Sequence, residues 1–328
     1  MSNNFVQAFP FKYGNALHFL PEYTFLMFDN LSLLGLVPML NLQLLIDGLL
    51  IGSVFAIAAY GLALVWGVMN VKNLAQGDLV IMGGYLAFTL SQPPINLHPL
   101  LTIPIIFVLM FSFGWVLYHT IIRRVIERDL FTSLLATFGL AIVIQQLINI
   151  AYGPDVQTAE SGMAIREFFG GEITIADTKL VSFLLAVLMA ILITLFMKKS
   201  RMGRAIRATS QNARAARIMG IDTERVYAFT FSLNAGICGV AGVLISIIWV
   251  IQPFIGITHS IRSFVIVTSA GFGNLIGVII SSLGLGTIEQ FSGFVFGAEF
   301  QQATVVGLLV IVLILRQIKQ SRQRQVVQ

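Results

Sequence analysis

The chain has 328 residues, of which 57% are hydrophobic and 11% are charged, and its net charge is +5. A soluble domain carries roughly 25% charged residues, whereas here the charges gather in a few loops and leave apolar stretches about 20 residues long, the length that spans a bilayer. This pattern excludes a soluble globular domain. The single cysteine, Cys238, also excludes a disulfide framework and a cysteine-based zinc site.

Residues 1–41 are predicted to form an irregular or interfacial leader, because Pro21, Glu22, Asp29 and Pro38 interrupt its apolar residues. An additional span is the alternative there. From residue 42 onward the sequence predicts an all-α, polytopic integral membrane protein, because backbone polar groups in lipid must be paired within their own segment. About eight membrane segments are predicted, at residues 42–69, 79–91, 100–122, 133–152, 180–197, 226–250, 264–288 and 300–315.

Basic residues predict the orientation, because cytoplasmic loops carry an excess of Lys and Arg. The loop 198–225 holds eight basic residues, the short loop after Ile122 holds three, and the tail 317–328 holds Lys319, Arg322 and Arg324. We expect these three segments on the cytoplasmic side and the acidic loop 153–179 on the outer side. The basic charge is therefore a topology signal, and no nucleic-acid partner is expected.

Two interruptions rich in glycine and asparagine fall within the apolar segments, at residues 67–78 and 270–277. The chain must cross the membrane an even number of times between Gly220 and Arg316. Segment 264–288 is therefore predicted to be two half-length pieces, either a re-entrant hairpin or two short spans. Breaks in both halves of the chain indicate an internal repeat whose broken helices line a solute path. A pair of tight connecting loops is the alternative.

Polar residues at membrane depth are costly and are functional candidates by default. Several flank the two breaks, and Gln145 and Asn149 share one face of segment 133–152. Helix–helix contacts through Asn and Gln are the alternative interpretation, while Asp47 and Glu289 are assigned to water at segment ends. The predicted path residues are Asn70, Asn73, Gln76, Gly77, Asp78, Gln145, Asn149, Gly271, Gly273 and Asn274.

The loop 198–225 is the most specific feature of the sequence. Five alanines between positions 205 and 216 predict a helix. Gly220 suits a left-handed cap at its end, and Asp222 suits the N-cap of the next helix. The pattern predicts a short cytoplasmic helix joined tightly to a membrane helix, so that a force on the first moves the second. A basic loop held by anionic lipid headgroups is the alternative.

At this loop the sequence resembles the permease subunits of the branched-chain amino-acid ABC importers, whose pattern is matched by Arg207, Ala208, Arg214, Ala216, Gly220 and Ile221. Further matches at residues 67–78, 135–140 and 273–277 extend the resemblance over residues 42–316, the expected permease domain. The resemblance implies an ATPase-coupling helix formed by Arg204, Arg207, Ala208, Asn212, Arg214, Ala216, Gly220 and Ile221.

The resemblance also implies a multi-pass subunit of a bacterial-type inner membrane that imports branched-chain or other hydrophobic amino acids and is not an enzyme. Its expected partners are a second related permease or a second copy of this chain, two cytoplasmic ATP-binding subunits and a periplasmic solute-binding protein. The chain has no Gly-Lys dipeptide and therefore no phosphate-binding loop. ATP and Mg²⁺ are thus expected on the partner ATPase, with no cofactor or metal on this chain.

Departures from the family pattern keep a second solute class open. Gln211 and Asn212 stand where family members often have acidic residues, and Gln76 stands where many have His. The stretch 209–212 looks closer to the urea and short-amide relatives. An autonomous channel or ion-coupled carrier ranks lower, because it usually needs ionisable residues inside the bundle. A membrane-embedded enzyme would need a catalytic cluster that the sequence does not contain.

Overall fold

The computed structural model describes residues 19–325 apart from 127, 129, 160 and 272. Within these residues, seven helices are long and apolar enough to cross a membrane. The only strands in the described part of the chain form one two-stranded antiparallel hairpin. The predicted all-α membrane fold is therefore confirmed, and the protein is a multi-pass membrane protein.

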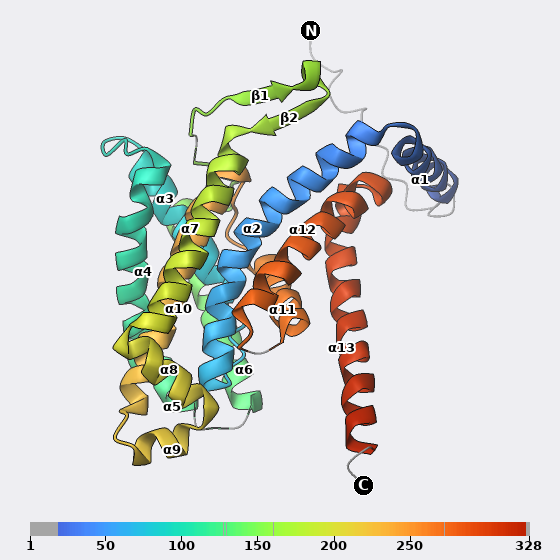
Figure 1. Cartoon of the computed structure of the whole chain (residues 1–328). Helices are drawn as coiled ribbons and strands as arrows, with labels where there is room; N and C mark the ends of the chain where they lie inside the picture. Colours follow the sequence, from blue (N-terminus) through green and yellow to red (C-terminus); the bar gives the residue numbers. More distant parts are fainter. Residues whose placement is uncertain (1–18, 127, 129, 160, 272, 326–328) are drawn as a thin grey trace, which may run out of the picture.

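The elements follow one another in a simple order (Figure 1). The helices are α1 (Phe19–Leu36), α2 (Pro38–Met69), α3 (Gln76–Ser91), α4 (Ile103–Leu117), α5 (Arg123–Val125), α6 (Leu130–Tyr152), α7 (Asp177–Lys199), α8 (Arg201–Gln211), α9 (Ala213–Ile218), α10 (Thr223–Ile248), α11 (Gly256–Ala270), α12 (Leu275–Phe296) and α13 (Gln301–Gln325). A π-helical turn (Tyr118–Ile122) joins α4 to α5, and 3-10 turns cover Pro99–Thr102, Phe169–Gly171 and Ala298–Phe300. The hairpin strands are β1 (Ile165–Phe168) and β2 (Ile173–Ala176).

Helices α2 and α10 form the centre of the bundle, and their apolar stretches are almost entirely buried. Small residues allow other helices to approach them closely, as expected where packing rather than water drives helix association. A Cβ atom on Gly48 of α2 would lie 2.5 Å from the Cα atom of Thr287 on α12. One on Gly83 of α3 would lie 2.5 Å from the Cα atom of Gly239 on α10. The core is therefore held by backbone-to-backbone contact.

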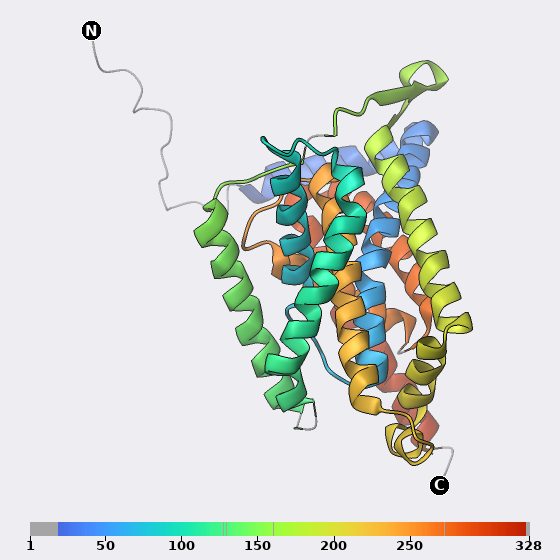
Figure 2. The same cartoon turned by 90° about the vertical axis from the view of Figure 1, so that its left-hand side faces the viewer.

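Helices α6 and α13 lie at the edges of the bundle. Only 6% of the apolar stretch of α13 is buried, against 94% for α2. Figure 1 shows α13 standing beside α11 and α12, and Figure 2 shows α6 along one margin of the bundle. Within the described chain, α6 packs mainly on α3, and α13 packs on α11 and α12. Both outer helices thus leave broad apolar faces uncovered within a single chain.

The two halves of the bundle share one order of elements: a long buried helix, a break, a short helix, and an outer helix at the end. Helix α3 has 16 residues and α11 has 15. Helix α2 begins beside the β-hairpin, because Gln43 Nε2 donates to the Thr174 carbonyl at 2.7 Å. Helix α10 begins at the opposite end, where Glu224 pairs with Arg123. The two halves therefore run in opposite directions, as in an inverted repeat.

The position of the second break differs from the prediction. The segment equivalent to the first break is 249–255, between α10 and α11, and not 270–277, which is the turn between α11 and α12. Segment 264–288 is indeed two helices, but α12 has 22 residues and is full length. Four helices, α10 to α13, therefore follow one another in this region, and all but the short α11 are long and apolar enough to cross a membrane.

The basic and acidic loops lie at opposite ends of the bundle, as predicted. The C-terminal tail is at the end that carries α8 and α9 (Figure 1). It does not form a separate segment, because α13 continues to Gln325. Residues 19–36 of the predicted irregular or interfacial leader form α1 and are therefore not irregular, and Asn30 Nδ2 donates to the Phe294 carbonyl at 2.9 Å. Residues 1–18 lie outside the described residues.

Candidate functional site

The first break begins at Asn70, whose left-handed backbone (φ 53°) ends α2. Asn70 is exposed, whereas Asn73 is fully buried. Asn73 Oδ1 accepts a hydrogen bond from the Ala75 amide at 3.2 Å, which turns the chain into α3. Thr137 of α6 bonds the same break, because its hydroxyl donates to the Lys72 carbonyl at 3.2 Å. The break is therefore fixed by specific hydrogen bonds.

Gln76 opens α3 in the middle of a buried polar cluster. Its Nε2 donates to the Ala58 carbonyl at 2.8 Å and to Asn234 Oδ1 at 3.1 Å, and it lies 3.1 Å from Cys238 Sγ. Asn234, on α10, is fully buried and its Nδ2 has no partner. The sequence analysis did not select Asn234. The available signal was an amide in the middle of an otherwise apolar helix.

Gly77 and Asp78 lie where α3 meets α11. The Gly77 amide donates to Ser260 Oγ at 2.8 Å, and a Cβ atom on Gly77 would lie 1.8 Å from the Gly256 carbonyl oxygen. The first turns of the two short helices are thus in direct contact. Asp78 is 1% exposed, and its Oδ1 accepts from Gln145 Nε2 of α6 at 2.9 Å. The structure thus brings together two of the predicted path residues, Asp78 of the first break and Gln145 of segment 133–152.

Asn149 lies one helical turn beyond Gln145 on the same face of α6. Its Oδ1 atom is buried and has no hydrogen-bond donor. Farther along, the Tyr152 hydroxyl of α6 lies 2.5 Å from Thr89 Oγ1 of α3, and the ring centroids of Tyr85 and Tyr152 are 4.7 Å apart. A row of polar side chains therefore lies along the contact between α3 and α6.

Gly271, Gly273 and Asn274 do not join this cluster. They form the turn at the far end of α11, a helix about 22 Å long at 1.5 Å per residue. Both glycines have positive φ angles (89° and 75°), and Asn274 Oδ1 caps α12 by accepting from the Gly277 amide at 3.0 Å. The sequence pattern there reflects a tight turn, which was the alternative interpretation of the breaks.

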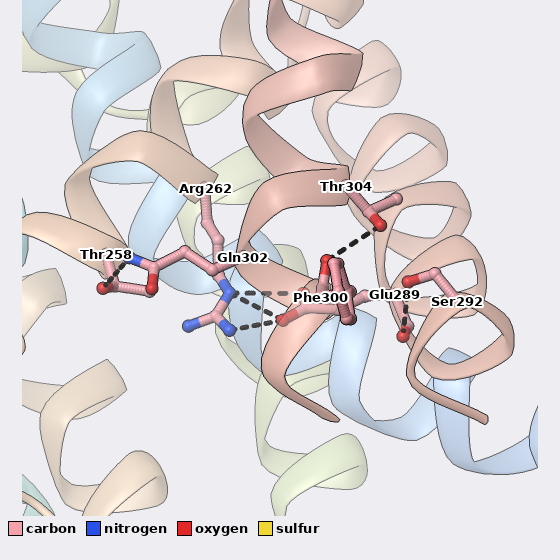
Figure 3. A network of polar contacts seen from close by, with 7 residues as sticks. All are labelled: Thr258, Arg262, Glu289, Ser292, Phe300, Gln302 and Thr304. Atoms are coloured by element: carbon pink, nitrogen blue, oxygen red, sulfur yellow. Dashed lines mark hydrogen bonds and ion pairs between the residues drawn. The ribbon is translucent and has the colours of Figure 1, made fainter. Parts of the chain in front are cut away.

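A buried ion pair lies between α11 and α12 (Figure 3). Arg262 Nε donates to the two carboxylate oxygens of Glu289 at 3.1 and 3.2 Å, and Glu289 is 3% exposed. The guanidinium also lies 5.0 Å from the centre of the Phe55 ring. Assigning Glu289 to water at a segment end was therefore wrong. Asp47 does lie near a segment end, beside the β-hairpin, where it binds Lys179 Nζ at 2.7 Å.

The predicted cytoplasmic helix is two helices, α8 and α9, separated at Asn212. Asn212 has an extended backbone (φ −158°), and its Oδ1 accepts from the Ala215 amide at 3.0 Å. Asn competes for backbone donors and so favours a cap over a helix interior. The rest of the prediction is confirmed: Gly220 has a left-handed backbone (φ 83°), and Asp222 Oδ1 caps α10 through the Arg225 amide at 3.0 Å.

The predicted coupling residues divide into anchors and exposed groups. Arg204 donates to the Lys199 carbonyl at 3.0 Å and Arg207 to the Met197 carbonyl, so both fasten α8 to the end of α7. Ala216 is buried, Ala208 and Ile221 are half-buried, and Arg214 is exposed. The sequence analysis did not select Ile218 and Met219, which end α9 and are 79% and 81% exposed.

A bundle of membrane helices with oppositely directed halves, a buried polar centre and a helical projection at its basic end defines a membrane permease. The sequence matches the family described as "Branched-chain amino acid transport system / permease component" over residues 44–315. The chain belongs to this family, and the resemblance stated from the motifs is confirmed.

Two curated permeases match over most of their length, and a third matches over less than half. The chain is 27% identical over 288 residues to the high-affinity branched-chain amino acid transport system permease protein BraD of Pseudomonas aeruginosa, covering 84% of this chain and 94% of that protein. It is 29% identical over 287 residues to LivH of Escherichia coli, a permease protein of the same printed description, covering 83% and 92%. The ribose import permease RbsC of Bacillus subtilis is 28% identical over 142 residues, which is 41% of this chain and 44% of that protein. No solved structure matches the chain.

Proposed function

We propose that this chain is a membrane-spanning subunit of an ATP-binding cassette importer of an inner membrane, and that it carries branched-chain amino acids. It would work with a second permease, which is either a related chain or another copy of this one. Two cytoplasmic ATP-binding subunits would hydrolyse Mg-ATP, and a periplasmic binding protein would deliver the solute. The subunit itself would provide the path and the coupling contact.

The observation that carries this proposal is that the α8–α9 projection exposes apolar side chains and is joined directly to α10. Two large apolar side chains, Ile218 and Met219, stand almost fully exposed beside the exposed Arg214. Such a group is typical of the anchors by which one protein enters a pocket of another. The Ile221 amide bonds the Ala216 carbonyl at 3.0 Å, and Asp222 then starts α10 at once. A displacement of α9 is therefore passed directly to the most central part of the bundle.

The test is co-purification of the ATP-binding subunit with the tagged permease in mild detergent. We expect the double variant I218D/M219D to retain the ATP-binding subunit at least about 30-fold less well, because a central anchor contributes about 2 kcal/mol or more. The matched control is Ile165→Asp on β1, which is 69% exposed at the opposite end. Unchanged recovery of the ATP-binding subunit with I218D/M219D would refute the coupling role.

The solute is tested by ATP-driven uptake into proteoliposomes that hold the whole assembly, with leucine and urea supplied separately. Asn212 does not favour urea over amino acids, because its side chain caps α9, a task that an acidic residue performs equally well. We expect uptake of leucine. Uptake of urea without uptake of leucine would replace the substrate part of the proposal and leave its coupling part intact.

A further inference from the structure

Two carboxylates are buried at membrane depth, and only one of them has a counter-ion. Glu289 is paired with Arg262, as described above. Asp78 is 1% exposed and receives a hydrogen bond from the neutral amide of Gln145, and no described residue forms an ion pair with it. A buried charge without a partner is costly. An unpaired acid at membrane depth is therefore a functional candidate in its own right.

The surroundings of Asp78 compensate its charge only in part. It stands in the first turn of α3, where the helix dipole favours a negative charge. The first residue of α11, Gly256, is so close that a Cβ atom there would lie 2.0 Å from Asp78 Oδ1. The beginnings of two helices thus face one carboxylate. The partial charges at helix ends stabilise the Asp78 carboxylate but do not neutralise it. A cation would therefore bind favourably there.

Two polar groups farther along the contact between α3 and α6 have no hydrogen-bond partner among the described residues. We define the α3–α6 seam as the contact formed by Asp78, Tyr85, Thr89, Gln145, Asn149 and Tyr152. Asn149 Oδ1 is buried without a donor, and the Tyr85 hydroxyl, on a fully buried residue that faces Tyr152, also has no partner. Buried polar groups are normally satisfied, so these two are able to bond with a passing solute.

The seam joins the bundle to a helix that lies at its margin. Helix α6 lies at the margin of the bundle (Figure 2), and most of its apolar stretch is uncovered in the single chain. Within the described residues it is joined to the rest through the seam, through the break at Thr137 and near α5. A small outward movement of α6 would expose Asp78 without disturbing the central pair α2 and α10.

We infer that Asp78 is the specificity-determining residue of the permease, which accepts the ammonium group of the solute as it passes along the α3–α6 seam. An ammonium group has one positive charge and three N–H donors, which match the Asp78 carboxylate and the unfilled acceptor on Asn149. This assignment rests on the proposed function, and it explains a preference for amino acids over urea, which carries no charge.

The experiment uses the complete importer in proteoliposomes, with leucine delivered by the same loaded binding protein to every variant. Both leucine uptake and ATP hydrolysis are measured for Asp78→Asn, which keeps the shape and removes the charge. Asp78→Glu tests rescue by a second carboxylate. The matched control is Asp47→Asn, which breaks the ion pair with Lys179 beside the β-hairpin.

We expect Asp78→Asn to lower leucine uptake at least about tenfold, which corresponds to about 1.4 kcal/mol, while ATP hydrolysis stays within about twofold. Asp78→Glu should recover part of the uptake, and Asp47→Asn should change neither quantity. Leucine uptake by Asp78→Asn at the wild-type rate would overturn the inference. So would a parallel loss of uptake and ATP hydrolysis, because that result assigns Asp78 a purely structural role. Failure of the wild-type assembly to import any amino acid refutes the proposed function first, and the inference with it.

Discussion

The ion pair between Arg262 and Glu289 allows a quantitative test of how the second half of the bundle is held together. Its side chains are only 16% and 4% exposed, so solvent screens the interaction little. Glu289→Leu removes the acceptor of three hydrogen bonds and leaves a buried guanidinium without a counter-ion. Breaking one side of a buried pair typically costs 3–5 kcal/mol, and we expect a loss of about that size in the free energy of unfolding.

The assay is reversible unfolding in mixed micelles of mild detergent and SDS, followed by circular dichroism. The double variant R262M/E289L removes both charges and should recover most of the loss, because apolar replacement of a buried pair is often neutral or stabilising. The control is Glu299→Leu, at an exposed carboxylate in the turn before α13. A loss below about 1 kcal/mol for Glu289→Leu, or a double variant no better than the single one, would contradict the reasoning.

Three further predictions concern single residues at a helix contact and at helix ends. Gly77→Ala should lower the stability by about 1–3 kcal/mol and impair uptake, because its Cβ atom would lie 1.8 Å from the Gly256 oxygen. Gly139→Ala, which meets nothing within 4 Å, should leave both quantities unchanged in the same thermal-stability and uptake assays. Asp222→Ala should cost about 1 kcal/mol by removing the α10 cap, measured by SDS unfolding, and a change below about 0.3 kcal/mol would contradict the cap. Gly220→Ala forces a non-glycine residue to φ 83° and should cost about 1 kcal/mol in that unfolding assay, with weaker recovery of the ATP-binding subunit; an unchanged variant would contradict the left-handed cap.

The sequence predicted what depends on local pattern. Apolar length located the membrane helices, and Gly220 and Asp222 located the ends of two helices correctly. The same reasoning overlooked the break at residues 249–255. That stretch contains no glycine or asparagine, so it was left as part of the connection between predicted segments 226–250 and 264–288. The sequence pattern instead indicated a break at residues 270–277, where the glycines form a turn.

The candidate site depended on contacts between residues far apart in the sequence. Gly77 meets Ser260 across 183 positions, and Gln76 meets Asn234 across 158. Neither partner stands out in its own segment, because a small residue or an amide in an apolar helix is compatible with ordinary packing. The distinction between Asp78, which lacks a counter-ion, and Glu289, which has one, likewise depends on where α11 lies.

By itself, the sequence determined that this chain spans a membrane, that its basic and acidic loops lie at opposite ends, and that the loop 198–225 is helical. These properties follow from transfer of apolar segments into lipid, from the distribution of Lys and Arg, and from local capping, and each acts over one segment. Only the tertiary structure decided that α3 and α11 meet at their first turns around a carboxylate. That arrangement arises because backbone contact at glycines sets the distance between helices, and a glycine acquires its contact only when a partner helix is in place.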